Sequence, residues 1–249
     1  MTRTHRLAAA LGCGSLVLGL VVPLSVSGVA AGSTFRDCSG RTVEAGADLR
    51  RCDLSGAVII GLDLHAVDLS RANLEDVDAG CDPDQPRTNL TAARLFKADA
   101  QRALLCDAIL VGADLRGADL RGASLEDADL RAAGAASIRL DGAGANFAQF
   151  TDARMAHASL RSLAAVGATF NGADLRGVDA RDGDLAHARF VDADLRGARL
   201  DRTDLTMADL SGADLHRATG LDTAIWSATT CPDGTNSDAD GGTCVGHLG

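Results

Sequence analysis

The sequence predicts an all-β fold, a four-sided β-solenoid of about nine coils whose ends are capped and pinned by disulfides. Three observations predict it: a five-residue repeat over most of the chain, the even spacing of Phe150, Phe170 and Phe190 within that repeat, and a near absence of aromatic side chains. Hydrophobic residues make up 46% of the chain but aromatic residues only 3%. We therefore expect a core of small and branched aliphatic side chains.

The repeat is clearest between Leu90 and Ile225. Among the residues taken at every fifth position across that range, 22 of 28 are large and apolar. Two places earlier in each pentad, from residue 93 to residue 218, 21 of 26 positions are alanine. Aspartate often stands between the two, as in Ala113-Asp114-Leu115, so the unit reads A-D-L-x-x.

A spacing of five excludes regular helices and continuous strands. On an α-helix five residues advance by about 500°, so the leucines would step around the axis by about 140° and form no single apolar face. In a continuous strand an odd spacing would send successive leucines to opposite faces. The remaining solution is a short extended triplet, with the small residue and the leucine inward and the aspartate outward, followed by a two-residue corner.

The corners and the phenylalanines indicate the shape of the solenoid. Corner pairs such as Arg116-Gly117 fit, because glycine adopts the dihedral angles that a tight corner requires. Four pentads per coil would place every fourth inward residue on the same side, so three phenylalanine rings would stack. The inward residues predicted in this way include Phe150, Phe170, Phe190, Leu115, Leu120, Leu195 and Leu215.

The A-D-L-x-x unit, repeated in register from about residue 45 to 228, resembles the pentapeptide-repeat family. The resemblance implies a right-handed, four-sided β-helix with leucine or phenylalanine at the inward centre of each triplet and alanine two residues earlier. Neighbouring coils would lie about 4.8 Å apart, so nearly nine coils would make a rod of roughly 40 Å.

Residues 1–31 have the features of a Sec-type signal peptide. A basic start precedes a mostly apolar stretch from Leu7 to Leu24, and small residues end at Ala31, where cleavage is expected. A membrane span is the alternative, but glycines and a proline interrupt the apolar stretch and no basic cluster follows. We therefore expect an exported protein, secreted or at the cell surface, with no membrane span after cleavage. Residues 32–45 would cap the first coil.

Six cysteines follow the signal peptide, and an even number in an exported chain indicates disulfides. Six cysteines allow fifteen connectivities, so proximity in the sequence is the guide. A zinc site is the alternative, but no C-x-x-C spacing occurs. Proximity suggests the pairs Cys38–Cys52, Cys81–Cys106 and Cys231–Cys244.

The repeat falls into two blocks, residues 46–79 and 89–228, that are out of phase by one residue. The segment between them, residues 80–88, contains two of the four prolines. We predict that it bulges from the rod as a loop tethered through Cys81. Such a loop is either a simple insertion or a binding loop, and the sequence leaves both interpretations open.

Residues 229–249 form a tail bounded by cysteines that would cap the last coil, with Trp226 packing beneath it. The tail resembles one that follows the repeats in exported actinobacterial pentapeptide proteins. Three of its residues match the start of a calcium loop, although His247 stands where such a loop needs a glutamate. The alternative is an ordinary turn rich in Asp, Asn and Gly. The candidate metal ligands are Asn236, Asp238 and Asp240.

The formal charge of −10 argues against binding of nucleic acid or an anionic membrane through a basic surface. Much of this acidity belongs to the repeat, because aspartate is its outward residue. Asp174, Asp194 and Asp214 would stack along one side, with Arg176 and Arg196 offsetting part of their repulsion.

No catalytic constellation emerges from the sequence. With four pentads per coil, no two histidines after the signal peptide share a side and a level, and no nucleophile elbow or phosphate loop occurs. We expect no enzyme and no cofactor. The leading hypothesis is an exported scaffold or protein-interaction module, monomeric or weakly associating, with an unidentified protein partner. A calcium- or small-ligand-binding protein using the tail or the inserted loop is the second hypothesis. The third is an acidic DNA mimic that binds DNA gyrase, as some relatives are thought to do.

Overall fold

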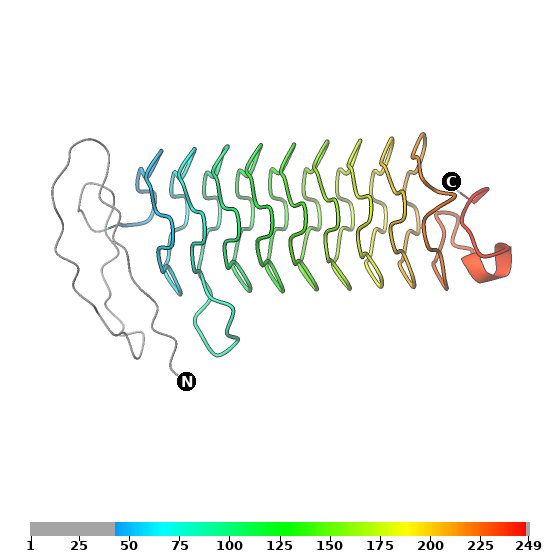
Figure 1. The fold of residues 1–249 in the computed structure, drawn as a ribbon, viewed down its shortest axis with the longest axis horizontal. Coiled ribbons are helices and arrows are strands. Elements are labelled where there is room, and N and C mark those ends of the chain that lie inside the picture. Colours follow the sequence, from blue (N-terminus) through cyan, green and yellow to red (C-terminus); the bar gives the residue numbers. More distant parts are fainter. Residues whose placement is uncertain (1–42, 248–249) are drawn as a thin grey trace.

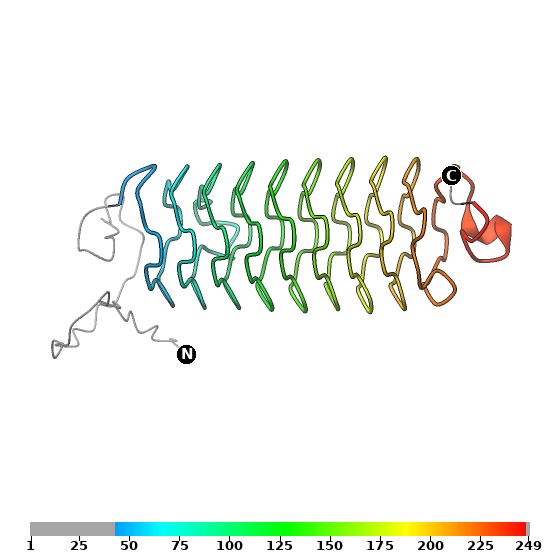
Figure 2. The ribbon, with the colours of Figure 1, turned by 90° about the horizontal axis from the view of Figure 1, so that it is seen from above.

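The computed structural model describes residues 43–247, which form a straight rod built of stacked coils (Figure 1). The rod keeps its regular outline when turned by 90° about its long axis (Figure 2). One segment bulges from its side near the N-terminal end, and the tail closes its C-terminal end (Figure 1).

Parallel bridges join successive coils through residues that are four pentads apart, such as Asp114 and Gly134. The bridges form four ladders with nine members each, which confirms the four-sided solenoid. We call the sides faces I to IV, after the ladders that run from Asp48, Asp53, Val58 and Asp63, and we number the coils 1 to 9 along each ladder. Each edge is named by the two faces that it separates.

The extended segments are so short that the described residues contain isolated bridges rather than longer strands. The one helix in that part of the chain is the 3-10 helix η1, Ser237–Asp240. A corner at every fifth residue imposes this pattern, because an extended segment of three residues is too short to form more than a single bridge to each neighbouring coil.

Backbone hydrogen bonds within one pentad show why the unit is stable. The N–H of Asp114 donates to the preceding coil and the N–H of Leu115 to the next, at 2.9 and 2.7 Å. The N–H of Gly117 also donates to the next coil, and the N–H of Ala118 closes the corner onto the Leu115 carbonyl. The remaining N–H, that of Arg116, donates to Oδ1 of Asp114 at 3.3 Å. Every N–H of the pentad therefore has an acceptor inside the rod.

The core is a continuous column of inward side chains. The predicted inward residues are all at most 3% exposed: Leu115, Leu120, Phe150, Phe170, Phe190, Leu195 and Leu215. Alanines fill the second inward position of most pentads and are equally buried, so each coil presents a narrow interior to its neighbours.

The three phenylalanine rings stack as their spacing predicts. The ring centroids of Phe150 and Phe170 are 4.7 Å apart and those of Phe170 and Phe190 5.0 Å, with interplanar angles of 1° and 3°. Each of these coils holds alanine where other coils have leucine. The substituted alanines are Ala135 and Ala145 beside Phe150, Ala165 beside Phe170, and Ala180 beside Phe190. In these three coils the large ring is therefore accompanied by at least one small inward side chain on another face.

Positive φ angles occur at many corner residues that are not glycine. In every corner from Ala92 to Arg217 the second residue has a positive φ. Many of these residues are not glycine, among them Phe147 with a φ of 60° and Met207 with a φ of 58°. The corner hydrogen bond and the bond to the next coil impose this conformation whatever the side chain, at a cost of about 1–2 kcal/mol for a residue with a Cβ.

The inserted loop lies on edge III/IV and is shorter than predicted. The bridge from Asp63 crosses it and reaches Asn89, which shows that six residues are added to one coil. Thr88, predicted as its last residue, instead belongs to the coil and is fully buried. Its Oγ1 lies 2.9 and 2.8 Å from the carbonyls of Ile59 and Ala79 and accepts the N–H of Gly61.

The prediction that Ile225 points inward is wrong, because its side chain is 49% exposed. Ile225 bridges to Asp204 rather than to Leu205, so one extra residue in the preceding corner shifts the repeat. Trp226 takes the inward place at 3% exposure, and its Nε1 donates to the carbonyl of Leu221 at 2.9 Å. The shifted register then continues past residue 228, since Thr229 and Cys231 are also buried in inward positions.

We predict that Phe170→Ala will lower the free energy of unfolding by about 3–5 kcal/mol, because it leaves a cavity between two stacked rings. Phe147→Ala is the matched control, since Phe147 is 57% exposed, and should change stability by at most about 0.5 kcal/mol. Chemical denaturation of both variants measures the difference. Equal effects would contradict the stacked core.

The corner conformation gives a second prediction. Ala132→Gly should raise the free energy of unfolding by about 0.5–1 kcal/mol, because Ala132 has a φ of 57° that glycine adopts without steric cost. Gly142→Ala should lower it by about 1 kcal/mol through backbone strain alone, since an added Cβ would meet no atom within 4 Å.

The control for these variants is Ala136→Gly, in the first corner position, where no positive φ occurs. It should destabilise the protein by about 0.5–1 kcal/mol. Denaturation midpoints order the three variants, and a loss of stability in Ala132→Gly would refute the assigned strain.

Candidate interaction surface

Several outward aspartates form ion pairs with arginines of the adjacent corner. In seven pentads the carboxylate accepts two hydrogen bonds, 2.6–2.8 Å long, from the guanidinium of an arginine two residues later. Such bidentate pairs are geometrically specific. The pairs are Asp48–Arg50, Asp114–Arg116, Asp119–Arg121, Asp129–Arg131, Asp174–Arg176, Asp179–Arg181 and Asp194–Arg196.

Arginines also reach the carboxylates of the next coil. Arg176 lies 3.6 Å from Asp194, and Arg196 lies 3.5 Å from Asp214. The stacked aspartates of face I are therefore interleaved with positive charge, as the sequence suggests. This interleaving removes much of the repulsion that a column of like charges would otherwise create.

Asp179 on face II has the densest set of cationic neighbours. Hydrogen bonds from Arg181 at 2.7 Å and Arg161 at 2.8 Å hold the pKa of its carboxyl far below the usual range, and Arg199 lies 3.6 Å away. The same type of pairing lowers the pKa of Asp129 through Arg131 and that of Asp174 through Arg176. These carboxylates stay ionised well into the acid range.

Charge is distributed unevenly between the edges. We define the cationic edge as the corner residues of edge I/II, which include no carboxylate. Its charged members are Arg50, Arg51, Arg71, Lys97, Arg116, Arg176, Arg196 and Arg217. Four of them, Arg51, Arg71, Lys97 and Arg217, are absent from every ion pair found in the described chain.

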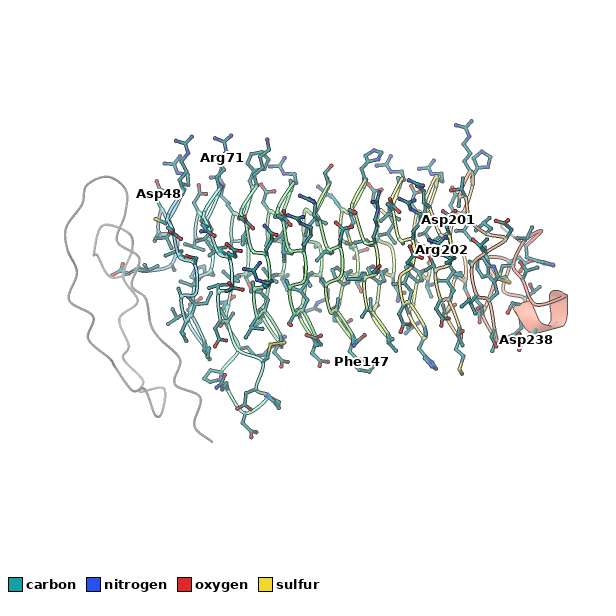
Figure 3. The ribbon with its side chains drawn as sticks, in the orientation of Figure 1. Asp48, Arg71, Phe147, Asp201, Arg202 and Asp238 are labelled. Atoms are coloured by element: carbon teal, nitrogen blue, oxygen red, sulfur yellow. A yellow bond between two sulfur atoms is a disulfide. The ribbon has the colours of Figure 1, made fainter. Side chains whose placement is uncertain are left out.

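Edge III/IV is the diagonal opposite of the cationic edge, and we call its corner residues together with residues 80–87 the loop edge. Figure 3 shows Arg71 and Phe147 projecting from opposite sides of the rod. The loop edge has one cation, Arg87, whose Nε donates to the carbonyl of Asp107. Its carboxylates are Asp82, Asp84, Asp107, Glu126 and Asp127.

The loop edge also holds the most exposed apolar side chains of the repeat corners. Phe147 is 57% exposed and Met207 54% exposed. A disulfide between Cys81 and Cys106, with an S–S distance of 2.01 Å, ties the inserted loop to the corner of the next coil. Loop, disulfide and exposed apolar groups thus lie on one line along the rod (Figure 3).

The tail is held by a disulfide between Cys231 and Cys244 and by side-chain hydrogen bonds. Asn236, proposed as a calcium ligand, caps η1 by accepting the N–H of Asp238 at 3.0 Å. Asp238 accepts the N–H of Ala228 at 2.8 Å. Two of the three candidate ligands therefore bind backbone groups, as in an ordinary capped turn. The third, Asp240, ends η1.

Other sequence-based candidates are not brought together. Residues 43–247 contain no group of three or more His, Cys, Asp or Glu side chains that could hold a metal ion. Within the same residues, no helix has the length and hydrophobicity to span a bilayer. Cys38, the predicted partner of Cys52, lies outside the described residues, as do the predicted signal peptide and nearly all of the predicted N-terminal cap.

A shallow groove on face II and edge II/III is lined by Arg121, Arg139, Asp141, Ser159 and Arg161, among others. Its arginines are already paired: Arg121 and Arg139 with Asp119, and Arg161 with Asp179. The groove therefore has little spare positive charge for an anionic ligand.

Comparison with known proteins agrees with this geometry. The model of the family described as pentapeptide repeats matches eight copies, over residues 45–76, 101–134, 146–179 and 181–217. The chain belongs to the pentapeptide repeat family. Pentapeptide repeat proteins are in general non-enzymatic interaction proteins, and no catalytic family is indicated for this one.

Among solved structures, this pentapeptide repeat protein is similar to HetL, which is involved in heterocyst differentiation regulation in the cyanobacterium Nostoc sp. strain PCC 7120. The two are 28% identical with a TM-score of 0.64, and the match covers 77% of this chain and 92% of HetL. The shared architecture is the right-handed, four-sided β-helix.

Two further matches have lower TM-scores. Full-length QnrB1, a plasmid-mediated fluoroquinolone resistance protein, is 17% identical with a TM-score of 0.40, over 82% of this chain and 96% of QnrB1. A pentapeptide repeat protein of the Arabidopsis thaliana thylakoid lumen is 28% identical with a TM-score of 0.29, over 42% of this chain and 66% of that one. No curated protein matches the chain significantly.

The division into a cationic edge and a loop edge is the feature that the sequence analysis missed. The signal was present, because sorting the corner residues by their position within each coil of four pentads assigns every one to an edge. The net charge hides this pattern, since it sums over all four edges.

The ion pairs of this pentapeptide repeat protein predict its response to acid. The pKa of Asp179 and of the paired aspartates is lowered by folding, so their stabilisation is present above the pKa of an unfolded aspartate, about 3.9, and is lost as the pH falls below it. We expect the free energy of unfolding to stay level from pH 7 to about pH 4.5 and then to fall.

Asp179→Asn should reduce the size of that fall, because it removes the carboxylate with the strongest pairing. Asp152→Asn, at a corner residue absent from the ion pairs of the described chain, is the control and should leave the pH profile unchanged. Denaturation series at pH 3 to 7 measure the three profiles. Identical slopes for the wild type and Asp179→Asn would contradict the assignment.

Proposed function

We propose that this pentapeptide repeat protein is an exported, non-enzymatic scaffold that presents a rigid surface to another protein. The observation that carries the proposal is the separation of roles within the pentad. Inward positions and backbone N–H groups are used to build the rod, while corner side chains point to solvent and vary from coil to coil. A surface of this kind favours binding over a length of rod rather than at one enclosed site.

Export is part of the proposal and rests on the sequence of residues 1–31, with its basic start, apolar stretch and small residues before Ala31. The two disulfides within the described residues support it, since such bonds persist in oxidising compartments.

The surface gives little support to mimicry of duplex DNA. The aspartates of face I are interleaved with arginines, and the outward row of face III contains only three acids: Asp78, Asp184 and Asp204. A regular double row of unpaired negative charge, which a DNA mimic needs, is therefore lacking on these two faces.

Fractionation of the cells that produce the protein tests the proposal. We expect the chain in the medium or the cell envelope, with its N-terminus at residue 32. Cross-linking in those fractions should then capture a protein partner in a complex with the rod. An intact N-terminus and a cytoplasmic location would refute export and bring a cytoplasmic target such as gyrase back into consideration.

A further inference from the structure

The two opposite edges of the rod carry complementary groups at the same levels. In coil 2 the cationic edge has Arg71, and the loop edge has the inserted loop with Asp82 and Asp84. In coil 3 Lys97 stands diagonally across from Asp107. Because both edges follow the same coil spacing, two rods that lie side by side can keep all their coils at matching levels.

The match continues through the centre of the rod. In coil 4 the cationic edge has Arg116, and the loop edge has Glu126 and Asp127. In coil 5 the cationic edge has no charge, and its Ala136 and Ser137 stand at the level of the exposed Phe147. The small corner of one rod is thus level with the large apolar side chain of the next.

The groups on both edges are available for contact. Arg71 and Lys97 on the cationic edge are exposed, as are Asp82, Asp84 and Asp127 on the loop edge. All five are missing from the ion pairs of the described chain, in contrast to the paired aspartates of faces I and II. Pairing these groups between two molecules would break no existing ion pair.

We propose that the loop edge binds the cationic edge of a second copy of this chain, with the two rods side by side, parallel and in register. The contact is heterologous, so each copy retains one free edge of each kind and further copies add to the same sheet of rods. This self-association goes beyond the scaffold function and does not depend on which protein the scaffold binds.

The parallel direction follows from the charges. An antiparallel pair would place Arg71 against Met207 and Lys97 against His187, so neither cation would meet an acid. The loop acids of coils 2 and 3 would face Arg196 and Arg176, which are already bonded to aspartates of their own chain. Two loop edges facing each other would bring no cation to their carboxylates except Arg87, which is bonded to Asp107. Only the parallel arrangement of unlike edges brings Arg71 and Lys97 to the loop acids and also covers Phe147.

The association is expected to be weak and sensitive to salt. Exposed ion pairs contribute little individually, and the net charge of −10 on each chain opposes close approach. At about 0.15 M salt the Debye length is about 8 Å, which screens distant charges but leaves groups in contact attractive. The apolar contact at Phe147 adds a term that salt does not screen.

Sedimentation velocity of the protein over a range of concentrations tests the interface. At about 0.15 M NaCl the sedimentation coefficient should rise with concentration, and at about 1 M NaCl this rise should weaken about fivefold or more. Phe147→Ser should also weaken association severalfold. A sedimentation coefficient that is independent of concentration up to about 1 mM would overturn the proposal.

Charge reversal on each edge gives a sharper test. The variant Glu126→Arg/Asp127→Arg and the variant Arg71→Glu/Lys97→Glu should each lose association when studied alone. An equal mixture of the two should associate again, because each mixed pair can join a wild-type loop edge to a wild-type cationic edge. Failure of the mixture to associate, with both variants folded by circular dichroism, would refute a heterologous contact.

The control is Asp152→Arg/Asp192→Arg, at two second-corner residues of edge IV/I. It changes the net charge by the same amount as Glu126→Arg/Asp127→Arg. This variant should associate as the wild type does. Loss of association in the control would overturn the edge assignment, because net charge alone would then govern the behaviour. Association that needs Phe147 but not Arg71 and Lys97 would instead indicate two loop edges in contact, and would overturn the proposed arrangement.

Discussion

The hydrogen bonds between coils are the interaction on which the whole rod depends. They fix each turn at four pentads, because a coil of any other length would displace each carbonyl from the N–H above it. Two exceptions show how strong this constraint is. The insertion after Ala79 and the extra residue before Ile225 are confined to corners, and the ladders resume beyond them. Extra residues are accommodated only in corners, outside the bridged segments of the chain.

The same constraint explains the preference for aspartate over glutamate. The N–H of the first corner residue in these pentads takes no part in the backbone bonds between coils, and the carboxylate two residues earlier accepts it, as Asp114 does for Arg116. Aspartate has the reach for this bond, and a bidentate arginine then lies across the same carboxylate. The acidity of the chain is therefore largely structural. What is left for recognition is the smaller set of corner charges that the repeat does not use.

The fold could be predicted from the sequence because its signal is local and repeated. The spacing of Phe150, Phe170 and Phe190 led directly to the stacked rings and the four sides. Ile225 was misplaced because a one-residue insertion in a corner leaves no mark in composition and is visible only from the bridge to Asp204. The loop edge was missed for a different reason. Residues such as Phe147 and Met207 are three coils apart in the sequence and come onto one line only after the chain has been wound.

The exchange of volume around the phenylalanine stack has a consequence for how this rod evolves. A coil that accepts a ring on one face gives up leucines on its other faces, as Ala135 and Ala145 show beside Phe150. The compensating partner of an inward substitution is therefore found one, two or three pentads away, on another side of the same coil. Related chains should display correlated changes at those separations, so a ring and the alanines beside it would be inherited together within one coil.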